Sequence, residues 1–167
     1  MLLKSRDVAY LGVLLGLNQL FIILSSVIET NTLILLAGAA LNVGIVIVEF
    51  GGRSGLLFYV ASCILGFFLT FNKIELITYI LFFGLYSIVK HIFEIKINSK
   101  TMLYVAKFIY FNIDLAAMYF TVKLFMPFKP VWWMILAAQA LFLVYDYAFT
   151  VFISSYEYNL KPKLKRK

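Results

Sequence analysis

The chain has 167 residues, of which 63% are hydrophobic and 14% are charged, and it carries a formal net charge of +7. A soluble domain would carry about 25% charged residues. The composition therefore excludes a separate soluble domain and predicts one integral membrane domain over residues 1–167. A nucleic-acid-binding role is also excluded, because the basic residues do not form a soluble face with stacking aromatic side chains.

The apolar runs are continuous rather than alternating, which excludes a β-barrel and favours an all-α fold. Each run approaches the roughly 20 residues that a helix needs to cross a bilayer. Asn18 and Gln19 interrupt the first run, and no small-residue cleavage site follows it, so we do not expect a signal peptide there. The sequence predicts a bundle of six transmembrane helices at about 7–28, 33–50, 54–71, 74–95, 101–126 and 131–156, followed by a basic tail at 157–167.

Short polar or turn-forming segments separate the predicted helices. The loop at 29–32 is polar, Gly51-Gly52 ends the second helix, and Asn72-Lys73 is only long enough to reverse the chain. Pro127 and Pro130 break the chain after the fifth helix. The pair Trp132-Trp133 that follows is typical of an interfacial anchor, although it could also form a stacking wall for a flat ligand.

Basic residues are distributed unequally between the two sides of the predicted bundle. Only Lys73, Lys123 and Lys129 fall on the side opposite the termini. The other twelve fall on the terminal side: Lys4, Arg6, Arg53, Lys90, Lys96, Lys100, Lys107, Lys161, Lys163, Lys165, Arg166 and Lys167. This asymmetry predicts that both termini are cytoplasmic, with anionic lipid as a partner at that face.

The sequence contains none of the motifs that carry enzymatic chemistry. It has one histidine, His91, and one cysteine, Cys63, with no metal-ligand spacing and no phosphate-binding glycine loop. We therefore expect neither a catalytic residue nor a metal or cofactor. His91 is interpreted as an interfacial residue and Cys63 as a small packing residue.

Polar residues inside the predicted helices are a better guide to functional positions, because they are costly in lipid and usually face a bundle interior or a cavity. Asn18, Lys107, Asp114 and Asp146 are predicted to be buried polar residues. Lys107 and Asp146 could form an ion pair, or Lys107 could extend to the interface. Asp114 is expected at the depth of Asn18 and Gln19, either in a structural hydrogen-bonded cluster or in a ligand or coupling contact.

A group of residues near the outer helix ends is predicted to form a ligand pocket with apolar walls and a few polar groups. The alternative is that they are ordinary loop and interface residues. The candidates are Glu29, Asn31, Asn72, Lys73, Glu75, Tyr79, Tyr119, Lys123, Trp133 and Gln139.

Small residues Ala9, Gly12 and Gly16 form a stripe on the first helix. Such stripes let a second helix approach closely in a membrane. They predict either packing inside the bundle or docking of a partner protein.

Several segments resemble the substrate-binding S component of energy-coupling factor transporters. They are KSRDVAYLGVLLG at the first helix, GGRSG before the third, FLTFNKIELITYILFFGLYSIVK over the central hairpin, and YDYAFTVFISSYEYNLKPKLK at the end. Members of that family typically carry Ala-xxx-Ala on the first helix. This chain has Ala9 and Val13, so Gly12 and Gly16 could replace the second alanine.

This resemblance implies six helices, a prokaryotic plasma membrane, and an outward-facing site for a vitamin or similar micronutrient. It also implies a separate transmembrane coupling protein, cytoplasmic ATPase subunits, and tilting of this subunit during transport. A second family remains as an alternative, the rod-shape-determining scaffold subunits of the MreD type. These are similar in size, organise cell-wall synthesis through protein contacts, and transport nothing.

Overall fold

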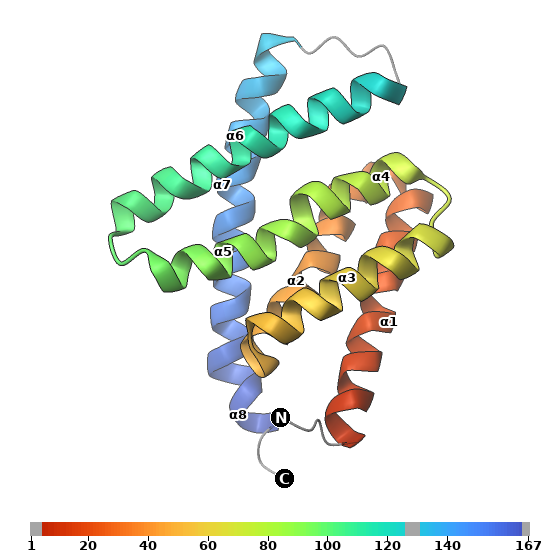
Figure 1. The fold of residues 1–167 in the computed structure, drawn as a ribbon, viewed down its shortest axis with the longest axis vertical. Coiled ribbons are helices and arrows are strands. Elements are labelled where there is room, and N and C mark those ends of the chain that lie inside the picture. Colours follow the sequence, from red (N-terminus) through yellow and green to blue (C-terminus); the bar gives the residue numbers. More distant parts are fainter. Residues whose placement is uncertain (1–4, 126–130, 165–167) are drawn as a thin grey trace. The chain divides into compact units, whose positions relative to one another are not determined.

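The computed structural model describes residues 5–125 and 131–164, and six of its helices are long and apolar enough to cross a membrane. Figure 1 shows the course of the chain through these helices. The predicted six-helix architecture is confirmed in this respect, and it fits a multi-pass membrane protein. The proline break at 127–130, and the basic residues Lys4, Lys129, Lys165, Arg166 and Lys167, lie outside the described residues.

The chain divides into two compact units, residues 1–107 and residues 108–167. The first unit contains a short 3₁₀ turn, η1, and a π-helical segment, η2, as well as α-helices. Its elements are α1 (Ser5–Val27), η1 (Glu29–Asn31), α2 (Thr32–Phe50), α3 (Gly52–Leu69), α4 (Lys73–Thr78), η2 (Tyr79–Gly84), α5 (Leu85–Lys96) and the start of α6 (Lys100–Phe125).

A single glycine joins α2 to α3. Gly51 has φ +86°, a left-handed conformation that side chains with a Cβ rarely adopt, and its N–H bonds the Ile47 carbonyl at 2.9 Å. This close turn places α2 and α3 against each other, with α1 packed against both.

The fourth span runs from Lys73 to Lys96 and contains the π-helical segment η2 in its middle. At Gly84, the end of η2, an added Cβ would lie 2.7 Å from Tyr59 Cε2, so only glycine allows this close approach of α3. A π-helical segment inside an α-helix often accompanies a functional site or a packing irregularity. Here it accompanies close packing and the buried polar contacts of Tyr79.

The second unit contains the rest of α6, followed by α7 (Trp132–Ser155), the π-helical segment η3 (Tyr156–Leu160) and α8 (Lys161–Leu164). Helices α6 and α7 meet where the rings of Phe111 and Phe142 stack, with centroids 4.4 Å apart and planes 8° from parallel. Gln139 and Asn112 are hydrogen-bonded beside this stack. Beyond this meeting point the two helices enclose a cleft.

The helix bounds agree with the sequence prediction to within a few residues, except at the end. The tail was predicted to begin at residue 157, but the described chain remains helical through η3 and α8 to Leu164. The sequence KPKL reads as a solvated basic segment, and its residues are nevertheless helical in the structure.

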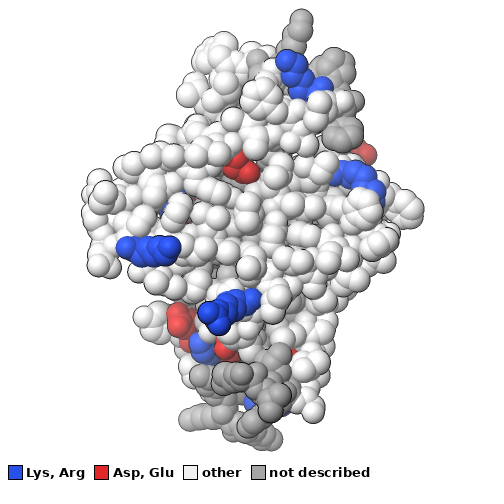
Figure 2. Space-filling model, viewed as in Figure 1, with Lys and Arg blue, Asp and Glu red and all other residues white. Residues whose placement is uncertain are grey.

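The outer surface is largely uncharged. Figure 2 shows separate Lys, Arg, Asp and Glu side chains on a face that otherwise lacks charge. Many large apolar side chains are exposed, among them Val13, Ile34, Phe68 and Leu136. Such exposure is expected of helices that face lipid tails rather than water.

Candidate functional site

A hydrogen-bonded group of four polar side chains lies at the centre of the first unit. We call Asn18, Gln19, Ser62 and Tyr79 the polar node. Asn18 Nδ2 donates to the Tyr79 hydroxyl at 3.0 Å and to the Ala39 carbonyl at 2.8 Å. Ser62 Oγ donates to Asn18 Oδ1 and lies 2.9 Å from the Tyr79 hydroxyl. The node thus joins α1, α2, α3 and η2.

Gln19 completes the polar node from the neighbouring position of α1. Its Nε2 donates to the Ser62 carbonyl at 3.0 Å and to Asn18 Oδ1 at 3.2 Å. Asn18, Ser62 and Tyr79 are fully buried, and Gln19 is 6% exposed. Tyr79 was predicted to line a ligand pocket, and this stays a prediction. In the structure Tyr79 is fully buried and its hydroxyl takes part in the node. The node therefore holds helices of the first unit together.

The turn between α3 and α4 brings three of the predicted site residues together. Asn72 Nδ2 donates to Glu75 Oε1 at 2.9 Å, and Lys73 Nζ donates to the carbonyls of Phe67 at 2.6 Å and Thr70 at 2.8 Å. Ser25 Oγ of α1 donates to Glu75 Oε2 at 3.4 Å. These bonds cap helix ends, while Asn72 and Lys73 remain exposed.

Glu29 and Asn31 lie in η1, and both are exposed. Neither side chain is hydrogen-bonded to the Asn72–Glu75 turn within the described residues. The first unit thus has polar side chains between α1 and α2 and at the α3–α4 turn.

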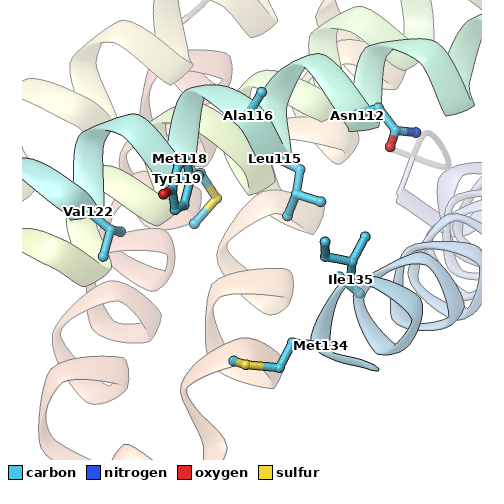
Figure 3. A pocket seen from close by; sticks show the side chains of 9 residues that line it. Asn112, Leu115, Ala116, Met118, Tyr119, Val122, Met134 and Ile135 are labelled. Atoms are coloured by element: carbon cyan, nitrogen blue, oxygen red, sulfur yellow. The ribbon is translucent and has the colours of Figure 1, made fainter. Parts of the chain in front are cut away.

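The second unit contains a cleft of about 590 Å³ between α6 and α7. Figure 3 shows Leu115, Met118 and Tyr119 of α6 opposite Met134 and Ile135 of α7. This volume lies within the range of about 300–1,000 Å³ typical of small-molecule sites. The lining residues are Asn112, Leu115, Ala116, Met118, Tyr119, Val122, Met134, Ile135 and Ala138.

A pair of amide side chains lies at the end of the cleft where α6 and α7 meet. Gln139 Nε2 donates to Asn112 Oδ1 at 2.9 Å, and Asn112 Nδ2 donates to the Phe108 carbonyl at 2.8 Å. Gln139 Oε1 is buried and accepts no hydrogen bond from the described residues. This amide pair supplies polar groups beside an otherwise apolar cleft, since Asn112 lines it directly.

Two further predicted site residues lie at the other end of the cleft. Tyr119 lines it, and Lys123 Nζ lies 5.9 Å from the centroid of the Tyr119 ring. Trp133 is 57% exposed and does not line the cleft, although its neighbour Met134 does. Of the ten predicted site residues, the structure places Tyr119 in this cleft, with Gln139 and Lys123 beside it.

The predicted docking stripe on α1 is exposed. Ala9, Gly12 and Gly16 are all classed as exposed, and a Cβ added at either glycine would meet nothing within 4 Å. Within the described residues the two glycines therefore do not serve close helix packing inside the bundle. Val13, between them, is 70% exposed.

The remaining predicted polar residues are buried. Lys107 is 4% exposed, Asp114 6% and Asp146 8%. Lys107 Nζ forms an ion pair with Glu94 Oε1 at 3.0 Å, and Lys90 Nζ lies 3.6 Å from the same oxygen. A pair between Lys107 and Asp146 would join the two units and stays a prediction. No group of three or more His, Cys, Asp or Glu side chains among the described residues could hold a metal ion.

Comparison with known proteins adds no assignment, since no protein-family model, curated sequence or solved structure matches this chain. Most of the cleft-lining residues were not predicted from the sequence. They are apolar residues on apolar helices, so nothing distinguishes Leu115 or Ile135 from residues that face lipid. Among the lining residues only Tyr119 was named as a candidate, as a residue near an outer helix end.

Proposed function

We propose that this chain is the substrate-binding membrane subunit, or S component, of an energy-coupling factor importer that captures a vitamin or similar micronutrient. The main observation in support of this proposal is the α6–α7 cleft. It has the size of a small-molecule site, apolar walls and a few polar groups at its ends, which is the usual make-up of such sites. The chain's own residues would bind the substrate, and separate ATPase subunits would supply the energy.

The proposed orientation has both termini in the cytoplasm, as the distribution of Lys and Arg favours. The cleft is lined by the second half of α6 and the first half of α7. In this orientation it lies in the outer half of the membrane. The outer side is the side from which an importer takes its substrate.

The exposed stripe of Ala9, Gly12 and Gly16 supports docking to a transmembrane coupling protein. An S component needs such a surface, and small residues allow close approach of a second helix. The same observation favours the alternative function. A scaffold subunit of the MreD type would also need an exposed helix-docking face, but it would have no use for a ligand-sized cleft.

Affinity purification of the full chain from its native membrane in mild detergent, with mass spectrometry of the associated proteins, distinguishes the two functions. The proposal predicts a multi-pass coupling protein together with ATPase subunits, lost on Gly16→Leu. Recovery of cell-wall synthesis proteins instead, with no ATPase subunit, would overturn it in favour of the scaffold.

A further inference from the structure

We infer that the α6–α7 cleft takes an uncharged small molecule with a mainly apolar body and one hydrogen-bonding edge. This inference rests on the proposed function and narrows it to a class of substrate. Three features of the cleft lead to it: the walls, the absence of charge among the lining residues, and the amide pair at one end.

The walls are apolar and adaptable. Leu115, Val122 and Ile135 contribute branched aliphatic side chains, and Met118 and Met134 contribute flexible thioethers. Methionine side chains adjust to irregular shapes and contact aromatic rings favourably. A ligand in this cleft would therefore gain affinity mainly by removing apolar surface from water.

No charged side chain among the described residues lines the cleft. Asp114 and Lys123 belong to α6, as most of the lining residues do, but neither is among the lining residues. A charged group placed between these walls would lose its hydration without gaining a charged partner in them, which is strongly unfavourable. We therefore expect the part of the ligand that lies between these walls to be uncharged.

The amide pair provides a hydrogen-bonding edge. An amide has two N–H donors and an oxygen with two lone pairs. Asn112 and Gln139 each use one donor in the bonds described above, and Gln139 Oε1 remains buried without a partner among the described residues. Asn112 lines the cleft and is exposed, and after the two bonds described above it keeps one N–H donor and one acceptor lone pair. A ligand that presents a neutral donor beside an acceptor, as a primary amide does, matches this unused capacity.

Photo-crosslinking of the full chain in lipid nanodiscs tests the inference. Three probes with the same diazirine-bearing alkyl chain, ending in a primary amide, a carboxylate or a trimethylammonium group, are irradiated with the protein, and the adducts are mapped by peptide mass spectrometry. We expect saturable labelling of the cleft-lining segments of α6 and α7 by the amide probe, about tenfold or more above that by either charged probe.

Matched tryptophan variants separate the cleft from the lipid-facing surface. Ala138→Trp fills the cleft and should abolish the saturable labelling, whereas Ala140→Trp places the same side chain at an exposed position outside it and should preserve the labelling. Both variants must elute as the same monodisperse species as the parent chain. The inference is overturned if the three probes label the cleft equally, or if labelling is unchanged in Ala138→Trp. It is also overturned if the protein prefers the carboxylate probe and Lys123→Gln removes that preference.

Failure of the inference can be told apart from failure of the proposed function. If the complex imports a charged micronutrient and Ala138→Trp leaves its affinity unchanged, the chain is an S component but its substrate does not occupy this cleft. If the amide probe labels the cleft as expected while purification yields no coupling protein or ATPase, the cleft binds a ligand but the importer function is wrong.

Discussion

Asn18 and Tyr79 are hydrogen-bonded at 3.0 Å, although 61 positions separate them in the sequence. The bond joins the middle of α1 to the first residue of η2 and is completed by Ser62 of α3. Interhelical hydrogen bonds of this kind hold a membrane bundle together where a hydrophobic driving force between helices is absent. The polar node thus stabilises the first unit, while the second unit carries the candidate binding cleft.

Replacement of Asn18 by leucine should destabilise the bundle, because Ser62, Gln19 and Tyr79 would lose a shared buried partner. We expect the free energy of unfolding to fall by about 1–3 kcal/mol, measured by denaturant titration in mixed micelles. Asn31→Leu is the matched control: Asn31 is exposed and its side chain makes no cap hydrogen bond to α2, so stability should change by less than about 1 kcal/mol. An equal loss of stability in the two variants would contradict the structural role of the node.

Glycines at close helix contacts should respond differently from the exposed glycines of α1. An added Cβ at Gly84 would lie 2.7 Å from the Tyr59 ring, so Gly84→Ala should destabilise the protein by about 1–3 kcal/mol through overpacking. Gly12→Ala meets nothing within 4 Å and should leave the thermal midpoint unchanged or raise it. Circular dichroism during heating measures both, and a lower midpoint for Gly12→Ala would show that this glycine does pack inside the bundle.

Gly16→Leu should weaken association with the coupling protein while leaving ligand binding and stability intact, because the position is exposed on α1. Quantitative recovery of the coupling protein, compared between this variant and the parent chain, provides the measurement. Leu20→Ala, at another exposed position of α1, is the control. It tests whether any substitution of an exposed α1 residue weakens association with the coupling protein. Joint loss of ligand binding and stability would place Gly16 in the packed interior.

The carboxylate of Glu94, near the end of α5, lies close to two buried lysines. Its Oε1 lies 3.0 Å from Lys107 Nζ and 3.6 Å from Lys90 Nζ, and both lysines are less than 5% exposed. Glu94→Gln should reduce stability by about 1 kcal/mol, a modest value because Glu94 itself is 41% exposed and screened by solvent. The same substitution at the exposed Glu157 should have no measurable effect in the same unfolding assay.

The sequence was sufficient to predict the six helices, because each apolar run is as long as a bilayer is thick and polar turns separate the runs. The π-helical segment at 79–84 was not predictable. Its residues continue the apolar pattern, and the close packing of Gly84 against Tyr59 at its end is a tertiary contact that the sequence does not show. The hydrogen bonds of Tyr79 in the polar node are likewise tertiary contacts between distant helices.

The candidate site was only partly predictable for a related reason. Tyr119 and Gln139 could be noticed from the sequence as residues with polar groups near the outer helix ends. The cleft itself depends on how α6 and α7 separate beyond the Phe111–Phe142 stack. In a membrane protein, apolar residues that line a cleft and apolar residues that face lipid have the same composition, so periodicity does not separate them.

Native mass spectrometry of the full chain, purified from its own membrane in mild detergent, tests the central claim most directly. The account predicts that the parent chain and Ala140→Trp carry one small molecule of the same mass, and that Ala138→Trp carries none. The same bound molecule in all three proteins would contradict this claim. So would a parent chain that carries no small molecule after purification and binds none from a broad panel of vitamins and their precursors.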